Sequence, residues 1–448
     1  MFALTSLLQR DFAHGVHPRD YKERTAALPT QRMPFMERYV LPLRQSLGAP
    51  AKPVVAVGER ILRGALIAEP GAFFSTSLHS PVTGWVRGIG TRRYPGGQFE
   101  PAIEIEADPF ATQRLDPAPR PDWRKLSLDE LSAEVQRAGI VGLGGAALPA
   151  HVKYALRDGV KIKTLIANGA ECEPYLTNDH RVMVERADDL LSGIEILHRL
   201  LGADETIIGI ELNKPDAIAT LRERIGSDSP IRVEPLRVKY PQGDSKMLIK
   251  SLLGIEVPKG LHAADLGIIM NNVSTIAAIA DWFNNGIPYI DRRVTVSGPG
   301  IPYPANLLVP LGTPVREVLR FCGGHTDDTR EVIMGGPMMG TPIASLDAPI
   351  IKTSSGVLAF TARETARPTE YPCIRCGRCV EACPYFLNPS KLARLARAHL
   401  YDELKQAHVS ECVECGSCTY SCPSGIPIVQ LIRSAKSSIR HAKDRVKG

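Results

Sequence analysis

CIRCGRCVEACP, residues 373–384, and CVECGSCTYSCP, residues 412–423, decide the fold of the C-terminal region. Both runs have the spacing C-x2-C-x2-C-x3-C-P, which is typical of small bacterial domains that hold two [4Fe–4S] clusters. In that arrangement three closely spaced thiolates bind one cluster, and the fourth cysteine of the run reaches the other cluster. The spacing therefore predicts one cluster on Cys373, Cys376, Cys379 and Cys422, and a second on Cys412, Cys415, Cys418 and Cys383.

The distribution of the cysteines favours metal ligation over disulfide bonding. Eight of the ten cysteines lie between residues 373 and 422 of a 448-residue chain, whereas a disulfide framework spreads them through a small secreted domain. Two zinc sites are the alternative, but zinc does not require a repeated cross-over spacing followed by proline. Residues 389–409, between the two runs, have a helical period. The other two cysteines, Cys172 and Cys322, are expected to be buried free thiols.

The composition is that of a soluble globular protein of about three domains. Hydrophobic residues make up 44% and charged residues 23%, and the formal net charge is only +6. No basic stripe is interleaved with aromatic residues, so we expect no nucleic-acid binding. The chain has neither the ~18 consecutive apolar residues of a membrane span nor the features of a signal peptide. We therefore expect a cytoplasmic protein, which remains able to dock on a membrane partner.

Apolar runs alternate with helical patterns between about residues 126 and 290. The expected strands are 163–167, 206–211, 231–239 and 266–271. The expected helices are 181–201, 215–225 and 273–285. This alternation predicts a doubly wound α/β domain with a mostly parallel sheet, in which ligands bind at the carboxyl ends of the strands.

Three stretches in this region carry a candidate ligand site. GLGGAALP, residues 142–149, precedes an expected helix with His151, Lys153 and Tyr154, and such a turn offers backbone N–H groups to phosphate. NGAECEP, residues 168–174, and MNNVST, residues 270–275, each follow an expected strand. A close-packed turn and helix capping are the alternatives. Three such stretches at strand ends favour one binding site over separate caps.

The chemistry of the clusters favours a flavin in that site. A nicotinamide cofactor gives up two electrons together as a hydride, whereas a [4Fe–4S] cluster accepts one electron at a time. Flavin is the usual organic cofactor that converts one mode of transfer into the other.

Two further motifs, HGVHP at residues 14–18 and GGPMMG at residues 335–340, complete a recognisable set. Together with the stretches above, they resemble the RnfC/RsxC family, the C subunits of the Rnf complexes, which are ion-translocating ferredoxin:NAD oxidoreductases of bacterial membranes. The chain is similar, more distantly, to the flavin-bearing NADH-oxidising subunit of respiratory complex I. The resemblance covers nearly the whole chain.

The resemblance implies FMN in the central domain, with NADH or NAD as the substrate. The FMN contacts that it implies are Gly142, Gly144, Gly145, Lys153, Asn168, Glu171, Tyr240, Gly243, Asn271, Asn272 and Thr275. It also implies a catalytic role for Glu173 and Lys153, because Glu173 matches the acidic position near which NADH lies.

The fold class that the resemblance implies is a multidomain α/β and α+β protein. The expected order is an N-terminal extension (1–34), a barrel-sandwich hybrid of biotinyl/lipoyl type (35–115), a Rossmann-like FMN and NADH domain (120–290), an SLBB-like β-grasp domain (291–345), a two-cluster ferredoxin module (360–432) and a basic tail (433–448). We expect the barrel to be structural, because no lysine lies between Arg63 and Trp85 to act as a swinging arm. The tail is either a solvated helix end or a docking surface for an acidic partner or anionic lipid.

The expected function is that of a peripheral electron-input subunit on the cytoplasmic face of the bacterial inner membrane. A hydride from NADH reduces FMN, and single electrons then pass reversibly through the two clusters to other subunits of a membrane electron-transport complex, with ferredoxin or flavodoxin as an indirect partner. The alternative is a non-catalytic conduit or scaffold with a degenerate NADH site. Ala147, Leu148 and Ser245 motivate it, because they depart from the glycine, phenylalanine and glutamate of related sequences.

Overall fold

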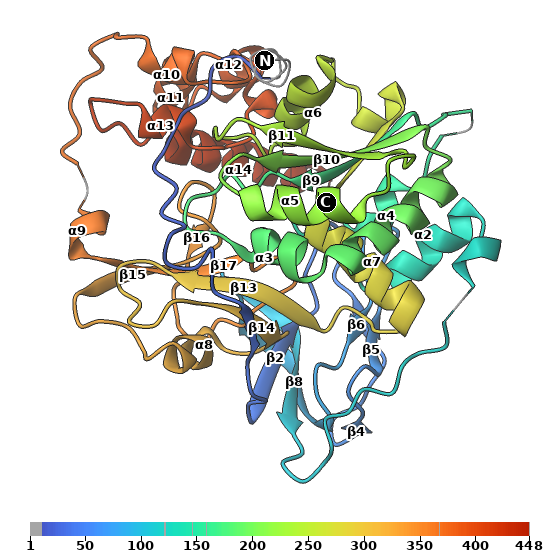
Figure 1. Cartoon of the computed structure of the whole chain (residues 1–448). Helices are drawn as coiled ribbons and strands as arrows, with labels where there is room; N and C mark the ends of the chain where they lie inside the picture. Colours follow the sequence, from blue (N-terminus) through green and yellow to red (C-terminus); the bar gives the residue numbers. More distant parts are fainter. Residues whose placement is uncertain (1–10, 121, 146, 158, 367, 448) are drawn as a thin grey trace.

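The computed structural model describes residues 11–120, 122–145, 147–157, 159–366 and 368–447. Figure 1 shows four units in chain order: a barrel (blue to cyan), an α/β domain (green to yellow), a second mixed unit (yellow to orange) and a helical module (orange to red). The order agrees with the expected fold class. Ala146 of the glycine-rich stretch and the first ten residues of the N-terminal extension lie outside the described residues.

The barrel-sandwich domain consists of two small antiparallel sheets. One has the order β2-β8-β7-β4 and the other β3-β5-β6. Their bounds are β2 (Arg38–Pro42), β3 (Lys52–Pro53), β4 (Arg60–Ile61), β5 (Leu66–Glu69), β6 (Leu78–His79), β7 (Gly84–Arg93) and β8 (Phe99–Ala107). In β8, Ile103 and Ile105 are buried in the core between the sheets, whereas Glu104 and Glu106 alternate with them and form ion pairs at the surface. This alternation is what a strand with one solvated face requires.

The central domain is built on a parallel sheet of order β11-β10-β9-β12. Its strands are β9 (Thr164–Gly169), β10 (Glu205–Glu211), β11 (Ile231–Leu236) and β12 (Ile268–Asn272). Its helices are α2 (Leu128–Arg137), α3 (Asn178–Glu185), α4 (Ala187–Leu201), α5 (Pro215–Arg224), α6 (Ser245–Leu253) and α7 (Val273–Asn285). Two separate apolar clusters pack on the sheet, one with α4 and α7 and one with α6. The doubly wound prediction is therefore confirmed.

The helix expected over 181–201 is instead two helices, α3 and α4. Arg186 between them has φ −126° and ψ 34°, which is outside the helical range. Its guanidinium donates to Asp189 at 2.9 Å and to Asp281 at 2.6 Å, and these contacts hold the break in place. Helical spacing of apolar residues continues across Arg186, so the period alone does not reveal the change of direction.

The second mixed unit is a six-stranded sheet of order β1-β14-β13-β17-β15-β16 with helix α8 (Val315–Phe321) and a short helix, α9 (Ala362–Thr365), directly after β17. Its strands are β1 (Thr30–Arg32), β13 (Asp291–Ser297), β14 (Ala305–Pro310), β15 (Thr329–Met334), β16 (Thr341–Pro342) and β17 (Gly356–Thr361). The sheet thus extends past the expected boundary at residue 345, because β17 lies between β13 and β15. It also includes β1, which comes from the N-terminal extension and pairs in parallel with β14.

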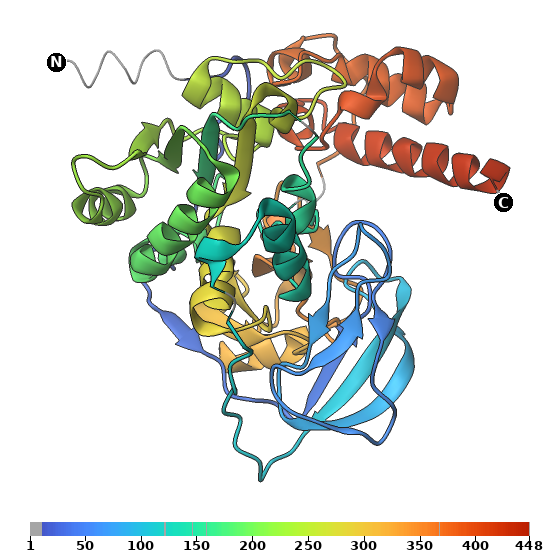
Figure 2. The ribbon, with the colours of Figure 1, turned by 90° about the vertical axis from the view of Figure 1, so that its right-hand side faces the viewer.

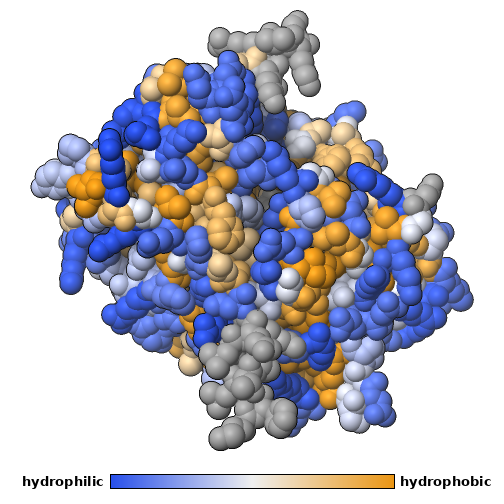
Figure 3. Space-filling view, turned by 90° about the horizontal axis from the view of Figure 1, so that it is seen from above, coloured by the Kyte–Doolittle hydropathy of each residue, from blue (hydrophilic) through white to orange (hydrophobic). Residues whose placement is uncertain are grey.

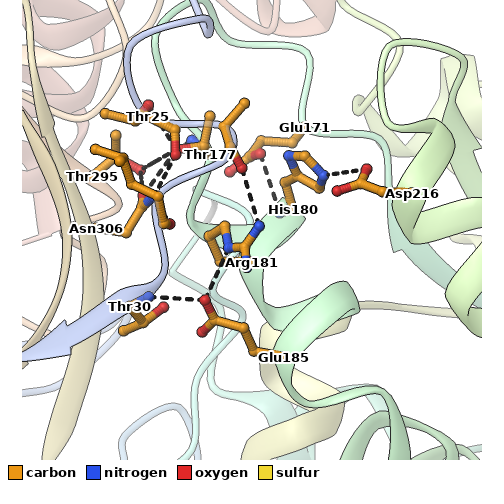
Figure 4. Close-up of polar contacts among 12 residues, drawn as sticks. Thr25, Thr30, Glu171, Thr177, His180, Arg181, Glu185, Asp216, Thr295 and Asn306 are labelled. Carbon is orange, nitrogen blue, oxygen red and sulfur yellow. Dashed lines mark hydrogen bonds and ion pairs between the residues drawn. The ribbon is translucent and has the colours of Figure 1, made fainter.

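The described part of the N-terminal extension, residues 11–34, runs along the other units as a strap. At one end Val16 pairs with Tyr240 of the central domain. Further along, the Thr177 hydroxyl lies 2.9 Å from the Thr25 hydroxyl and donates to Asn306 Oδ1 at 2.8 Å (Figure 4). The Thr30 amide donates to Glu185 of α3 at 2.8 Å. The strap therefore fixes the α/β domain against the β-grasp sheet.

The helical module contains two short helices of matching position, α10 (Arg378–Glu381) and α13 (Ser417–Tyr420), one in each cysteine run. Each follows a glycine with positive φ, Gly377 at 80° and Gly416 at 84°. The helix expected over 389–409 is broken into α11 (Pro389–Arg397), α12 (Tyr401–Gln406) and a 3-10 turn, η4 (Val409–Glu411). The break lies at His399, whose φ of 55° is left-handed and cannot continue a helix.

The tail forms one long helix, α14 (Ile428–Lys447), which begins inside the module's core. Arg433 and Lys436 form ion pairs with Glu414 at 3.0 and 2.7 Å. The start of the basic tail is therefore packed on the second cysteine run. The basic side chains beyond residue 442 lie outside what the structure describes.

No helix among the described residues is both long and apolar enough to span a bilayer. Figure 3 shows the molecule from above, with apolar patches separated by hydrophilic side chains.

Candidate cofactor and cluster sites

The three stretches singled out in the central domain meet at the carboxyl edge of its sheet. Asn168 of β9 is the direct neighbour of Asn272 of β12. The Leu143 amide donates to the Thr275 hydroxyl at 3.0 Å, and that hydroxyl donates to the Val141 carbonyl at 3.1 Å. The glycine-rich stretch is therefore tied to the start of α7. This is the edge at which parallel α/β sheets bind ligands.

The tip of the glycine-rich stretch is open. Gly144 and Gly145 are exposed, and a side chain at Gly145 would meet nothing within 4 Å. A Cβ on Gly144 would approach the Asn272 side chain at 3.4 Å, which is tight. The helix expected after this stretch is wrong: only a 3-10 turn, η2 (Ala150–Lys153), follows it. Phosphate binding here would rest on loop N–H groups and not on a helix dipole.

Lys153, at the end of η2, reaches the neighbouring strand. Its Nζ donates to the Met270 carbonyl at 2.6 Å. Burial lowers the pKa of Lys153 to about 8. The side chain is therefore a hydrogen-bond donor at the sheet edge, and it loses its charge at a lower pH than an exposed lysine does.

Asn271 provides a test of whether this edge fits a polar cofactor. It is fully buried, yet neither its Oδ1 nor its Nδ2 has a hydrogen-bond partner among the described residues. The Tyr154 hydroxyl lies beside it without meeting hydrogen-bond geometry. Gln242, one residue before Gly243, is likewise fully buried with both amide atoms unpartnered. Buried amides are normally hydrogen-bonded, so these two match a ligand rich in donors and acceptors, as FMN is.

Three other predicted contacts are already engaged by the protein. Asn168 donates to the Gly243 carbonyl at 2.9 Å. Glu171 accepts the amides of Asp179 at 2.8 Å and His180 at 3.3 Å, and so caps α3 (Figure 4). Asn272 donates to Asp179 at 2.6 Å. The three side chains lie near the carboxyl edge of the sheet, where these contacts hold them.

Glu173 is turned toward the GGPMMG motif. Its carboxylate accepts the amides of Met338 at 3.0 Å and Met339 at 2.9 Å. A Cβ at Gly336 would lie 2.3 Å from Glu173 Oε2, so that position requires glycine. Burial raises the pKa of Glu173 to about 7, although the two amides act in the opposite direction. The carboxyl group therefore ties the central domain to the β-grasp domain.

The first three cysteines of the second run surround a cavity together with the last cysteine of the first run. Cys383, Cys412, Cys415 and Cys418 all line it, and its other walls include Leu392, Val429 and Ile432. This is the grouping that the cross-over spacing predicts. Burial raises the pKa of Cys412 to about 11 and of Cys418 to about 12, and neighbouring thiols add to both shifts.

The first run is more open. Cys373 and Cys376 are exposed, and Cys379 and Cys422 are half-buried. Burial raises the pKa of Cys379, and the nearby Cys422 and Cys373 add to the shift. Cys422 therefore lies with the first run, as the cross-over requires. The other two cysteines are free thiols outside these groups: Cys322 is buried as expected, whereas Cys172 is half-buried. Burial raises the pKa of Cys172, and that of Cys322 to about 12.

One loop of the central domain joins the sheet edge to the second run. Gly243 in this loop contacts Asn168, while the Tyr240 hydroxyl donates to the Cys415 carbonyl at 2.6 Å. Asp244 accepts the Tyr385 hydroxyl at 2.8 Å. The same five-residue loop, residues 240–244, therefore contacts both predicted centres.

Two residues at this site were not predicted from the sequence. Arg292 and Lys352 of the β-grasp domain are buried, and each donates to a backbone carbonyl within or just before the glycine-rich stretch. Arg292 Nη2 reaches Leu143 at 3.2 Å, and Lys352 Nζ reaches Gly139 at 2.7 Å. Burial lowers the pKa of Lys352 to about 7. Isolated cations in strand-rich sequence give no signal of such a role.

Family models match four successive parts of the chain. They are an RnfC barrel sandwich hybrid domain over residues 10–109, a Nuo51 FMN-binding domain over 135–281, an SLBB domain over 293–342 and a 4Fe-4S dicluster domain over 372–427. These matches confirm the predicted fold class and the prediction of FMN and two [4Fe–4S] clusters, in place of zinc.

Curated relatives match over nearly the whole chain. It is 43% identical to the C subunit of the proton-translocating ferredoxin:NAD(+) oxidoreductase complex of Clostridium ljungdahlii, over 98% of this chain and 96% of the relative. It is 38% identical to the C subunit of the Na(+)-translocating ferredoxin:NAD(+) oxidoreductase complex of Acetobacterium woodii, over 96% and 97%. The C subunit of the ion-translocating oxidoreductase complex of Pseudomonas aeruginosa is 44% identical, and the match covers 95% of this chain and 55% of that longer relative.

A solved structure shares the fold. The match is to a chain of an NAD+-reducing [NiFe]-hydrogenase, with a TM-score of 0.53 and 21% identity, over 70% of this chain and 61% of the other.

Proposed function

Because the chain belongs to the family of C subunits of ion-translocating ferredoxin:NAD+ oxidoreductase complexes, we propose that it is the subunit that exchanges electrons with NADH. FMN, when bound, supplies the conversion between hydride transfer with NADH and single-electron transfer with iron–sulfur clusters. The chain's own residues hold the cofactor and fix the distance between FMN and the clusters. Its cysteines hold the clusters that carry the electrons onward.

The residues proposed to hold FMN surround the carboxyl edge of the central sheet. Gly144 and Gly145 offer exposed backbone to the phosphate, and Asn271 offers a buried amide that lacks a partner among the described residues. Gly142, Lys153, Asn168, Glu171, Tyr240, Gly243, Asn272 and Thr275 complete the proposed set. Arg292 and Lys352 support this set by fixing the two ends of the stretch from Gly139 to Leu143.

The observation that carries the proposal is the loop from Tyr240 to Asp244. It contacts the proposed FMN site through Gly243 and the second cysteine run through Tyr240. Asp244 binds Tyr385, which follows the first run and lines the cavity of the second-run cysteines. The cluster on Cys383, Cys412, Cys415 and Cys418 is therefore proposed to face FMN. The cluster on Cys373, Cys376, Cys379 and Cys422 is proposed to exchange electrons with a partner, because Cys373 and Cys376 are exposed.

Glu173 and Lys153 are the residues proposed for catalysis. The pKa of Glu173, raised by burial to about 7, and that of Lys153, lowered to about 8, allow both groups to hold or release a proton near neutral pH.

The relatives' names as subunits of ion-translocating complexes support a proposal about partners and location. We place the chain on the cytoplasmic face of a membrane complex as a peripheral component, in contact with other subunits and only indirectly with ferredoxin or flavodoxin. Electrons can pass in either direction, since each transfer step is reversible.

A non-catalytic conduit is the second candidate. It is favoured by the two amides that occupy the Glu173 carboxylate, since a carboxylate so engaged is less available to NADH.

One anaerobic experiment separates the two candidates. The full chain, loaded with FMN and iron–sulfur clusters, is mixed with NADH while flavin absorbance is followed. The proposed function predicts that NADH bleaches the flavin absorbance rapidly after mixing. The conduit predicts that the flavin stays oxidised. Absence of FMN from the loaded protein would contradict the proposed function outright.

A further inference from the structure

The barrel domain contacts the glycine-rich stretch directly. The Leu47 amide donates to the Ala147 carbonyl at 2.9 Å. Just beyond the stretch, His151 Nε2 lies 2.8 Å from the Phe73 carbonyl oxygen. Figure 2 shows the barrel (blue) beside the teal segment that contains this part of the central domain. Two loops of the barrel therefore form one rim of the proposed FMN site.

These loops present an aromatic ledge, defined as Leu47, Phe73 and Phe74. The three side chains are 55%, 52% and 47% exposed. The ring centroids of Phe73 and Phe74 are 5.5 Å apart in an edge-to-face arrangement, and that of Phe73 lies 5.2 Å from His151. Apolar side chains gathered and half-exposed at the edge of a ligand site are a feature of ring-binding surfaces.

The glycine-rich stretch itself has no aromatic residue. Residues 142–149 are glycine, alanine, leucine and proline only. NADH carries two ring systems, and its nicotinamide ring must lie against the flavin for hydride transfer. Its adenine ring is then left at the other end of the molecule, where an aromatic side chain is the usual platform for a base.

We propose that the aromatic ledge binds the adenine ring of NADH, so that the barrel domain forms part of the substrate site. The inference rests on the proposed function, and it assigns to the barrel a role beyond that of a structural module. Phe73 and Phe74 act as specificity-determining residues for adenine-containing donors. The contacts of Leu47 with the glycine-rich stretch and of Phe73 with His151, just after it, keep the ledge at a fixed position relative to the proposed FMN site.

The test compares two electron donors on the holoprotein. Phe73→Ala and Phe74→Ala are assayed for flavin reduction by NADH and by reduced nicotinamide mononucleotide, which lacks adenine. We expect at least one variant to raise KM for NADH about tenfold with unchanged kcat, and to leave KM for the mononucleotide unchanged. The Tyr variant at the same position should restore the KM for NADH, since tyrosine keeps a stacking face.

Controls separate this inference from loss of structure and from the proposed function. Phe99→Ala removes a somewhat more exposed ring at the start of β8 and should change neither KM. Binding of ADP-ribose to the same variants needs no electron transfer, so it tests the ledge even if NADH fails to reduce the flavin. An equal rise in KM for both donors would overturn the proposal, and so would unchanged binding of NADH and ADP-ribose in both alanine variants. If the variants lost only their assembly with other subunits, the ledge would be a contact for a protein partner instead.

Discussion

At the scale of single residues, the buried amides at the sheet edge carry the prediction of a cofactor. Asn271 is fully buried with both polar atoms unpartnered among the described residues, which costs about 1–3 kcal/mol per unsatisfied group in the flavin-free fold. A bound FMN would recover that cost. The same residue should therefore affect the two states of the protein in opposite directions.

Asn271→Leu is expected to raise the Tm of the flavin-free protein and to weaken FMN binding about tenfold, because it removes unsatisfied amide atoms and also a ligand contact. Thermal scans and quenching of FMN fluorescence measure the two effects. Asn284→Leu is the matched control, since that amide already bonds Ser192 at 2.8 Å. It should lower Tm and leave FMN affinity unchanged. A variant of Asn271 that binds FMN normally would remove this residue from the site.

Glu173 makes folding stability depend on pH. Its pKa rises from an ordinary value of 4.5 to about 7 in the fold, chiefly through burial. Between these two values the folded chain binds more protons than the unfolded chain, so the stability from this group is present below about pH 4.5 and is lost as pH rises to 7. The loss amounts to about 3 kcal/mol at most.

Glu173→Gln cannot ionise, so its Tm should fall less than that of the natural chain between pH 5 and pH 8. Thermal unfolding of the cluster-loaded proteins across this range measures the difference. Glu37→Gln, at an exposed position, serves as the control. Parallel curves for the natural chain and the Glu173 variant would show that this carboxyl titrates normally.

At the scale of elements, the strands of the central sheet and the two cysteine runs could be predicted because their signals are local. The breaks at Arg186 and His399 could not, since apolar residues keep a helical period across both. β17 pairs with β13, about sixty positions away, and β1 carries no apolar pattern. The supporting cations Arg292 and Lys352 were missed for a similar reason: only the fold brings them to the glycine-rich stretch.

The cross-over of cysteines between the two runs is the first prediction at this scale. Cys383→Ser should remove the cluster that Cys412→Ser removes, because both residues line one cavity, and should spare the cluster that Cys373→Ser removes. Iron content is expected to fall by about half in each variant. EPR spectra of the reduced proteins identify the surviving cluster. A Cys383 variant that matches Cys373→Ser would contradict the cross-over.

The packing of α4 on α7 provides the second prediction at the scale of elements. A Cβ at Gly193 would lie 2.3 Å from the Ile276 carbonyl oxygen, so the helices would have to separate. Gly193→Ala is expected to destabilise the central domain by about 1–3 kcal/mol, seen as a lower Tm and weaker FMN retention. Gly226→Ala, where nothing lies within 4 Å, should behave like the natural chain. Equal Tm values for the two variants would show that the helices adjust without cost.

At the scale of the whole molecule, the four units together support one proposed path of electron transfer, from FMN to the two clusters. The strap and the β-grasp domain hold the central domain in place. The glycine-rich stretch and the sheet edge form the proposed FMN site, and the Tyr240 loop connects that site to the second cysteine run. The exposed first run lies beyond it. The geometry therefore predicts an order of electron transfer as well as a set of cofactors.

The most direct measurement of that order is anaerobic reduction by NADH of two variants, each lacking one cluster and each loaded with FMN. In Cys373→Ser, which keeps the cluster facing FMN, both the flavin and that cluster should become reduced. In Cys412→Ser the flavin should still be bleached, while the remaining cluster stays oxidised because its nearest donor is gone. Prompt reduction of the first-run cluster in Cys412→Ser, with a silent second-run cluster in Cys373→Ser, would contradict the order derived from the Tyr240 contact.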